Sequence, residues 1–181
     1  MATSLVRESQ ALFIRRWGEM GASWGISRTM AEIHALLFLS TEPLCTDDIM
    51  DRLQVSRGNA SMNLRQLQNW GLIHREHRRG DRREYFVAET DVWQMFEIIT
   101  RERRRREIEP IIETIEKCRQ MVEQHLAAHG GEGRDGIKEY QRRLNHMQKF
   151  FTAMNTLFNI VVKVGQRGIG PVTKALSKWS G

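Results

Sequence analysis

Apolar residues at the start of the chain repeat at helical spacing. One helix is predicted from about Ser4 to Met20, and a second from Ser27 or Arg28 to Leu39, with the stretch GASWG between them. The inward positions are Leu5, Leu12, Phe13 and Trp17 in the first helix, and Met30, Ile33 and Leu37 in the second. Proline is scarce and helix formers dominate, so the pattern predicts a mostly α-helical protein.

Two further helices are predicted in the middle of the chain. Thr46 is expected to cap a short helix that ends near Leu53. After a tight connection, Ser56 is expected to cap a helix that ends at Trp70. Gly71 suits the position that follows a helix C-terminus.

An alternating pattern follows and predicts a β-hairpin. One strand begins at Leu72 and Ile73, the sequence RRGD forms the tip, and REYFV returns as the second strand. In the returning strand, Tyr85 and Val87 are expected on one face and Phe86 on the other. The order of the predicted elements is that of a winged helix-turn-helix domain: a helix, a short helix, a tight turn, a third helix and a hairpin.

Helical spacing returns at Asp91. Pro110 should break or kink the chain, and it suits the first turn of a new helix. Two apolar seams follow, separated by the predicted loop HGGEGRDG and ended by GQRGIGP and a short basic tail. The seams are Ile111, Ile112, Ile115, Cys118, Val122 and Leu126, and then Ile137, Tyr140, Leu144, Met147, Phe151, Met154, Phe158 and Val161.

These patterns divide the 181 residues into four parts. They are an N-terminal helix (1–26), the winged domain (27–90), a linker helix (91–109) and a C-terminal helical region (110–181). The two last helices are too long for a domain this small, so we expect them, with the first helix, to bury apolar surface against a second copy. Packing into one enlarged core is the alternative. The predicted fold class is mainly α with a small β-hairpin and a dimerisation arm.

Charge and cysteine content narrow the class of protein. The net charge is +6 and the isoelectric point about 9.8, which favours polyanionic partners. The longest nearly uncharged run, residues 150–162, is shorter than the ~20 residues that a membrane-spanning helix needs. The N-terminus does not resemble a secretory signal. Cys45 and Cys118 suit a reducing compartment, so we expect a cytoplasmic protein.

The helix after Ser56 has a polar side that a core helix does not need. Ala60, Leu64 and Leu67 would hold it on the domain, and the opposite side carries residue types that contact DNA. Arginine can bind guanine, and Asn or Gln can bind adenine, through paired hydrogen bonds; the helix N-terminus can hold a phosphate. The candidate contacts are Ser56, Arg57, Gly58, Asn59, Ser61, Met62, Arg65 and Gln66.

The hairpin tip is a second candidate contact. Its arginines are Arg78, Arg79, Arg82 and Arg83. Arginines on a thin protrusion suit a narrow, electronegative minor groove. Asp81 would be repelled by phosphate, and we expect it to orient Arg83 by a local ion pair. The alternative is that the hairpin and the polar helix face are ordinary solvated surface.

The segment DDIMDRLQVSRGNASMNLRQLQNWGLIHRE, followed by GDRREYFVAETDVWQM, resembles the GbsR/MarR branch of bacterial winged-helix regulators. The resemblance is close from Arg28 to Pro110 and keeps the Asp-x-Arg of the wider MarR family as Asp81 and Arg83. It implies a homodimer that binds a pseudo-palindromic operator and represses or activates transcription. Asn63 departs from the pattern, because MarR-like proteins usually carry an apolar residue there. By position, the implied recognition-helix contacts are Ser56, Arg57, Gly58, Asn59, Met62, Arg65 and Gln66.

Aromatic residues outside the hairpin could form an effector site. Trp17, Trp24, Trp93 and Phe96, together with Phe13, could gather into a cage that holds a quaternary ammonium compound by cation–π attraction. The resemblance supports this, because the branch includes regulators linked to choline and glycine betaine. The ordinary interpretation, which we favour, is hydrophobic core.

The remaining clusters point to no further chemistry. His125 and His129 have a spacing that can hold a metal, but no third ligand is adjacent in sequence, so no metal site is predicted. Cys45 is expected to be a buried residue rather than a redox sensor. The arginines from Arg101 to Arg106 are expected to pair with neighbouring glutamates on a solvated helix face. We see no catalytic constellation, and predict neither an enzyme nor a cofactor.

We therefore expect a sequence-specific, double-stranded DNA-binding transcriptional regulator. It would be a repressor that acts as a homodimer and is released by a small-molecule effector. The alternative is a winged-helix module that docks a protein partner and no longer reads DNA. The sequence leaves open the operator, the effector and the sign of regulation.

Overall fold

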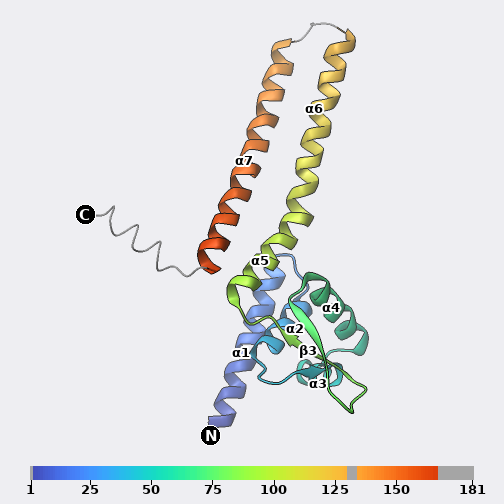
Figure 1. Cartoon of the computed structure of the whole chain (residues 1–181), viewed down its shortest axis with the longest axis vertical. Helices are drawn as coiled ribbons and strands as arrows, with labels where there is room; N and C mark the ends of the chain where they lie inside the picture. Colours follow the sequence, from blue (N-terminus) through green and yellow to red (C-terminus); the bar gives the residue numbers. More distant parts are fainter. Residues whose placement is uncertain (1, 130–133, 167–181) are drawn as a thin grey trace, which may run out of the picture. The chain divides into compact units, whose positions relative to one another are not determined.

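The computed structural model describes residues 2–129 and 134–166 (Figure 1). The chain divides into two compact units, with the boundary between Ile98 and Ile99. This boundary falls within the linker helix predicted at 91–109. The predicted basic tail and part of the predicted loop HGGEGRDG lie outside the described residues.

The first unit combines helices with a small antiparallel sheet. Its helices are α1 (Ala2–Ser23), α2 (Arg28–Leu39), α3 (Thr46–Leu53), α4 (Arg57–Trp70) and the start of α5 (Val92–Arg103). Its strands are β1 (Leu44–Cys45), β2 (Ile73–His77) and β3 (Glu84–Ala88), paired in the order β1-β3-β2. The predicted winged helix-turn-helix arrangement is confirmed.

The core of this unit forms where α2 packs against α1 and α4. Ile33 of α2, Ile49 of α3, and Leu64 and Leu67 of α4 are among its largest fully buried side chains. Burying a side chain of this size stabilises the fold by roughly 1.5–3 kcal/mol. Ala60 is buried as well, so the three predicted inward positions of α4 all face the core. The rotation of α4 about its axis is therefore the predicted one.

The start of α3 differs from the prediction. Thr46 is the first residue of the helix, and Cys45 occupies the capping position, where its backbone N–H donates to Asp48 Oδ2 at 2.9 Å. The reason is a strand that the sequence pattern did not predict. Leu44 and Cys45 pair with Phe86 and Tyr85 of β3. The sheet thus has three strands where a two-stranded hairpin was predicted, and the extra strand fixes where α3 begins.

The position of β3 between two strands explains its burial. Tyr85 and Phe86 point to opposite faces, yet both are buried, and Val87 is half-buried. As predicted, Tyr85 and Phe86 lie on opposite faces of the strand, but both faces are covered at these two positions. Because β3 pairs with β1 on one side and β2 on the other, it is the strand that anchors the hairpin to the domain.

The second unit continues α5 into a π-helical turn, η1 (Arg104–Ile108), then α6 (Glu109–His129) and α7 (Arg134–Gln166). Figure 1 shows α6 and α7 running antiparallel beside each other. Pro110 lies in the first turn of α6, as predicted, but the chain stays helical through it. In a regular α-helix the proline ring would crowd the carbonyl of Arg106, and the wider π turn relieves this contact.

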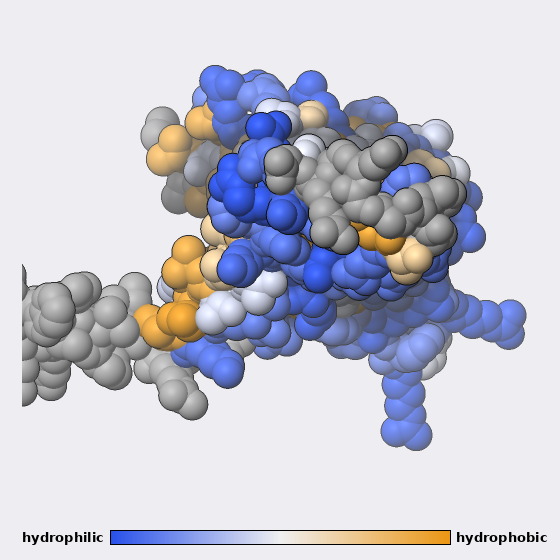
Figure 2. Space-filling view, turned by 90° about the horizontal axis from the view of Figure 1, so that it is seen from above, coloured by the Kyte–Doolittle hydropathy of each residue, from blue (hydrophilic) through white to orange (hydrophobic). Residues whose placement is uncertain are grey.

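Helices α6 and α7 leave much of their apolar surface uncovered. Ile115 and Val162 are buried, whereas many other large apolar side chains are exposed. The exposed ones are Ile111, Met121, Tyr140, Met147, Phe150, Leu157, Phe158, Ile160 and Val161. Figure 2 shows hydrophobic residues reaching a mostly hydrophilic surface in several places. Over the described ranges, every helix is too short or too polar to cross a membrane.

Candidate nucleic-acid interface

Helix α4 is fixed at both ends by local signals. At its N-terminus the Ser56 hydroxyl accepts the backbone N–H of Asn59 at 3.4 Å. At its C-terminus Gly71 adopts a φ of 84°, a left-handed conformation that strongly favours glycine. Both ends were predicted from the sequence. With its apolar side buried, the helix turns the opposite side towards solvent.

That outer side carries most of the predicted reading residues. Ser56, Arg57, Met62 and Arg65 are exposed, and Met62 exposes 55% of its surface. The half-buried members of the set are Asn59, Ser61 and Gln66. A protruding helix face with cationic, amide and thioether side chains fits the major groove of B-DNA in shape and in hydrogen-bonding chemistry.

Gly58 lies in the first turn of α4, and nothing in its own fold requires a glycine. It is exposed and helical, and a Cβ built there would have no neighbour within 4 Å. A glycine in a helix is less favourable than an alanine by roughly 0.5–1 kcal/mol. A close approach by another molecule's backbone, such as that of DNA, is one physical use for the missing side chain.

Asn59 differs from the other predicted contacts because its amide is already occupied. Its Nδ2 donates to Thr29 Oγ1 of α2 at 3.4 Å, and its Oδ1 accepts from Asn63 Nδ2 at 2.6 Å. A paired hydrogen bond to adenine would have to use the second hydrogen of Nδ2 and the second lone pair of Oδ1 while these contacts hold the amide in place. We conclude that Asn59 ties α4 to α2 and is a poor candidate for reading bases.

Asn63 explains the departure noted in the sequence. It is fully buried, at 0% exposure, and its Nδ2 also donates to the backbone oxygen of Asn59 at 2.8 Å. Its Oδ1 is buried without a partner in the described structure. The i,i+4 spacing of the two asparagines was the signal that could have revealed this pair.

A second link joins the two helices of the helix-turn-helix. Arg57, the first residue of α4, forms an ion pair with Asp47 in the first turn of α3. Both side chains are largely exposed, so the pair itself contributes little stability. It links the first residue of α4 to the first turn of α3.

The hairpin between β2 and β3 ends in a tight turn. The backbone N–H of Asp81 donates to the carbonyl of Arg78 at 3.1 Å, and Gly80 adopts a φ of 85° between them. A positive φ at this position of a turn strongly favours glycine. The turn exposes Arg79, and Arg82 and Arg83 are exposed beside it.

Asp81 organises one side of the tip. Arg83 donates to it through Nη2 at 2.7 Å and through its backbone N–H at 2.9 Å, and the Tyr85 hydroxyl donates at 2.8 Å. The Arg83 side-chain bonds, then its backbone N–H and the Tyr85 hydroxyl, hold the pKa of Asp81 far below its usual range. The ion pair between Asp81 and Arg83 was predicted; the tyrosine was not. Because Asp81 stays ionised, it keeps Arg83 close to the hairpin.

Arg78 is also held, by partners from outside the hairpin tip. Its guanidinium lies 4.5 Å from the centre of the Tyr85 ring, and its Nη2 lies 3.3 Å from Glu42 Oε2. Within the part of the chain that the structure describes, Arg79 and Arg82 form no ion pair. The four predicted wing arginines therefore divide into two that are anchored and two that are available.

The arginine run of the second unit pairs with glutamates. Arg103 binds Glu107 at 3.1 Å, and Arg105 binds Glu102 at 2.9 Å. Arg104 binds Glu109 at 3.1 Å and also Asn155 of α7. The prediction of a paired helix face agrees with these contacts.

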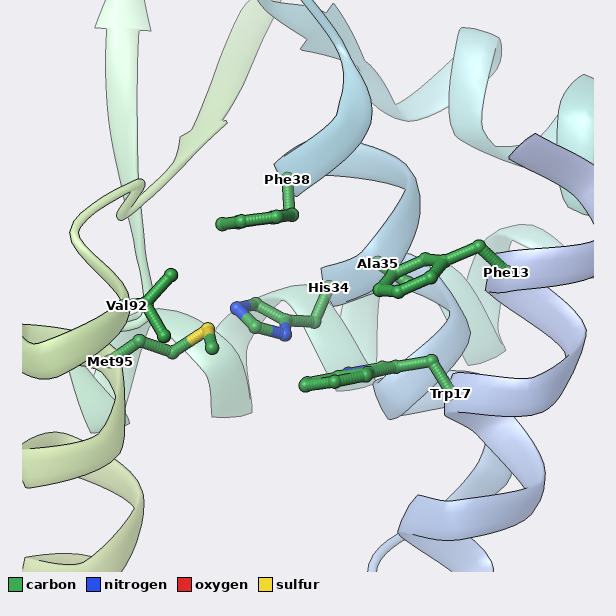
Figure 3. Close-up of a pocket in the computed structure, with 7 residues that line it drawn as sticks. All are labelled: Phe13, Trp17, His34, Ala35, Phe38, Val92 and Met95. Carbon is green, nitrogen blue, oxygen red and sulfur yellow. The ribbon is translucent and has the colours of Figure 1, made fainter. Parts of the chain in front are cut away.

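The predicted aromatic cage is only partly assembled. Trp17 stacks on Phe13, with ring centres 5.5 Å apart, and both line a pocket between α1, α2 and α5 (Figure 3). Trp93 and Phe96 contact each other edge to face at 6.3 Å but do not line that pocket. Trp24 follows α1 and is 51% exposed. The four residues predicted as one cage thus lie in three places.

The other candidate clusters stay without a ligand set. Among the described residues there is no group of three or more His, Cys, Asp or Glu side chains that could hold a metal ion. Cys45 is a buried free thiol, as expected, and His125 is exposed.

Comparisons with known proteins agree with this geometry. Residues 24–84 match a family model described as the MarR family. The HTH-type transcriptional repressor GbsR of Bacillus subtilis (strain 168) is 24% identical over 113 residues, which cover 62% of this chain and 62% of that relative. The match therefore spans less than two thirds of the relative's length.

Solved structures align with most of this chain. A crystal structure of a transcriptional regulator covers 88% of this chain and 99% of its own, with a TM-score of 0.59 and 22% identity. A crystal structure of an S. aureus MepR–DNA complex covers 84% of this chain and 98% of its own, with a TM-score of 0.38 and 17% identity. The first of these likenesses shows a common architecture.

Proposed function

We propose that this chain is a sequence-specific double-stranded DNA-binding transcriptional regulator of the MarR family, whose model matches residues 24–84. The family is one of transcriptional regulators and not of enzymes. The observation that carries the proposal is helix α4, which buries Ala60, Leu64 and Leu67 and exposes the side bearing Arg57 and Arg65.

The exposed groups divide into those that read bases and those that hold phosphates. Arg65 suits guanine, Met62 suits a thymine methyl, and Gln66 suits adenine, in the major groove. Ser56, Arg57 and the free N–H groups of the α4 N-terminus suit a phosphate. Arg79 and Arg82 of the wing reach the minor groove or its phosphates, and Arg83 acts from the position that Asp81 gives it.

The regulator acts as a homodimer on a pseudo-palindromic operator. The large apolar side chains that α6 and α7 leave exposed support this, because long helices with much exposed apolar surface commonly bury it against another protein. A two-fold dimer would present two copies of α4 about one DNA turn, ~34 Å, apart. The relative described as a repressor supports repression as the mode of action. Release by a small-molecule effector is a further part of the proposal.

Selection of bound duplexes from a random pool tests the proposal. We expect a symmetric site with two half-sites spaced by about one helical turn. Affinity for that site should fall by roughly 10³–10⁵ between 50 and 200 mM salt, if six to ten phosphates are contacted.

A control variant and a refuting outcome make the selection decisive. Arg16→Ala removes an exposed arginine of α1 that is paired with Glu19, and should leave the selected site and its affinity unchanged. If the wild-type protein enriches no duplex and its weak binding shows no steep salt dependence, the proposal is wrong. A winged module that docks a protein partner would then be the better assignment.

A further inference from the structure

One wing arginine, Arg78, is held by two partners that make different demands on it. Its guanidinium lies 4.5 Å from the centre of the Tyr85 ring, and its Nη2 donates to Glu42 Oε2 at 3.3 Å. Tyr85 belongs to β3, whereas Glu42 lies in the loop between α2 and β1, 36 positions before Arg78. A residue distant in sequence thus supplies a carboxylate to a side chain of the predicted DNA-binding surface.

The Tyr85 ring is a fixed platform for this arginine. The side chain is 4% exposed, and its hydroxyl donates to Asp81 Oδ2 at 2.8 Å. A guanidinium held over a ring offers the ring its face, while its N–H groups project from its edge. The ring therefore orders Arg78 and leaves N–H groups able to bind a charged oxygen, as a phosphate contact requires.

Glu42 occupies part of this edge. Its carboxylate offers the arginine the same kind of charged oxygen that a DNA phosphate would. The Arg78 side chain exposes 42% of its surface and the Glu42 side chain 77%, so the pair lies at the surface. The backbone oxygen of Glu42 accepts a hydrogen bond from Ser40 Oγ at 2.6 Å, which ties the loop at this point. The protein thus holds its own competitor for phosphate beside Arg78.

We propose that Glu42 limits the affinity of the protein for duplex DNA by holding Arg78 away from the phosphates. Paired, the two side chains add no net charge to the wing. Released, Arg78 would add a phosphate contact to those of Arg79 and Arg82. This role for Glu42 rests on the proposed function, because it is a role within DNA binding by the wing. Loss of the Glu42 carboxylate should therefore improve binding.

The size of the gain has an upper bound. If the pair stays closed on DNA, removal of Glu42 adds a phosphate contact that is weaker than the pair. If the pair opens on DNA, removal of Glu42 spares the protein the cost of opening it. In both cases the gain cannot exceed the contribution of the pair, and an exposed ion pair contributes about 1.4- to 5-fold in an equilibrium constant.

Titration of labelled duplexes measures the gain at about 50 mM salt, where exposed charges are less screened than at physiological ionic strength. Glu42→Gln keeps the size of the side chain and removes its charge. We expect its Kd to fall by about 2- to 5-fold for the selected operator and for a random duplex alike, because phosphate contacts carry no sequence information. Its urea midpoint should stay close to that of the wild type, because an exposed pair contributes little stability.

A double-mutant cycle separates the release of Arg78 from a general change in charge. In an Arg78→Gln background, Glu42→Gln has no arginine to release, so it should change the Kd by less than about 1.4-fold. Glu76→Gln is the matched control. It removes an exposed carboxylate of β2 that forms no ion pair within the described residues, and its effect should be equally small.

Three results would overturn this role for Glu42. They are a Glu42→Gln variant that binds duplex no more tightly than the wild type, an equal gain in the Arg78→Gln background, and an equal gain from Glu76→Gln. Where the wild type itself binds duplex, each of these refutes only the role of Glu42. If neither the wild type nor Glu42→Gln binds any duplex, the proposed function fails as well.

Discussion

His34 should make the protein sensitive to mild acid. The side chain is buried among aromatic rings, and burial lowers its pKa from the ordinary 6.5 to about 4. Between these two values the unfolded chain binds a proton that the folded chain does not. Stability therefore falls as the pH drops from about 6.5, and the loss is complete near pH 4, below which both states are protonated.

The size of the effect follows from the two pKa values. One pKa unit corresponds to about 1.4 kcal/mol, so the full loss is about 3.5 kcal/mol. Most of this loss falls in a pH range that is easily measured, because the free energy of unfolding should decrease by about 2 kcal/mol between pH 7 and pH 5. That is a large part of the ~5–15 kcal/mol by which a typical domain is stable.

Urea unfolding at fixed protein concentration measures this loss, provided that other titrating groups are subtracted. His34→Leu supplies the reference, because leucine removes the titrating ring and leaves an apolar side chain in place. The free energy of unfolding of the wild type should fall by about 2 kcal/mol more than that of the variant between pH 7 and pH 5. Parallel pH profiles of the two proteins would refute the argument, because they would mean that His34 takes up its proton as easily when folded as when unfolded.

Three changes test the proposed DNA contacts, and a fourth tests the proposed dimer contact. Gly58→Ala should raise the free energy of unfolding by roughly 0.5–1 kcal/mol yet weaken duplex binding; an alanine that stabilises the protein and leaves binding intact would show that no backbone approaches this point. Arg65→Ala should cost about 1–3 kcal/mol at the selected operator and much less on random duplex, measured by titration of both. Arg82→Ala combined with Arg83→Ala should weaken both kinds of duplex and lower the salt slope; an unchanged slope would exclude the wing from phosphate contact. Phe150→Glu combined with Leu157→Glu should yield monomers in sedimentation. Relative to the wild type, this variant should lose more affinity for the operator with two half-sites than for an isolated half-site.

The ends of α4 could be predicted because their signals are local. Ser56 and Gly71 act on backbone groups within a few residues, so the sequence alone places them. The start of α3 could not be predicted in this way. Cys45 takes the capping position from Thr46 because residues 44–45 pair with β3, forty positions further along the chain. Strand pairing at such separation leaves no mark in a short window of sequence.

The candidate site shows the same division. The outer side of α4 followed from its buried side, because helical periodicity links the two. The hydrogen bonds of the Asn59 amide could not be predicted from periodicity, because one of them depends on Thr29, which lies on another helix. The anchoring of Arg78 likewise depends on Glu42 and on the ring of Tyr85. Composition identifies arginines that could bind DNA, but tertiary contacts decide which of them are free to do so.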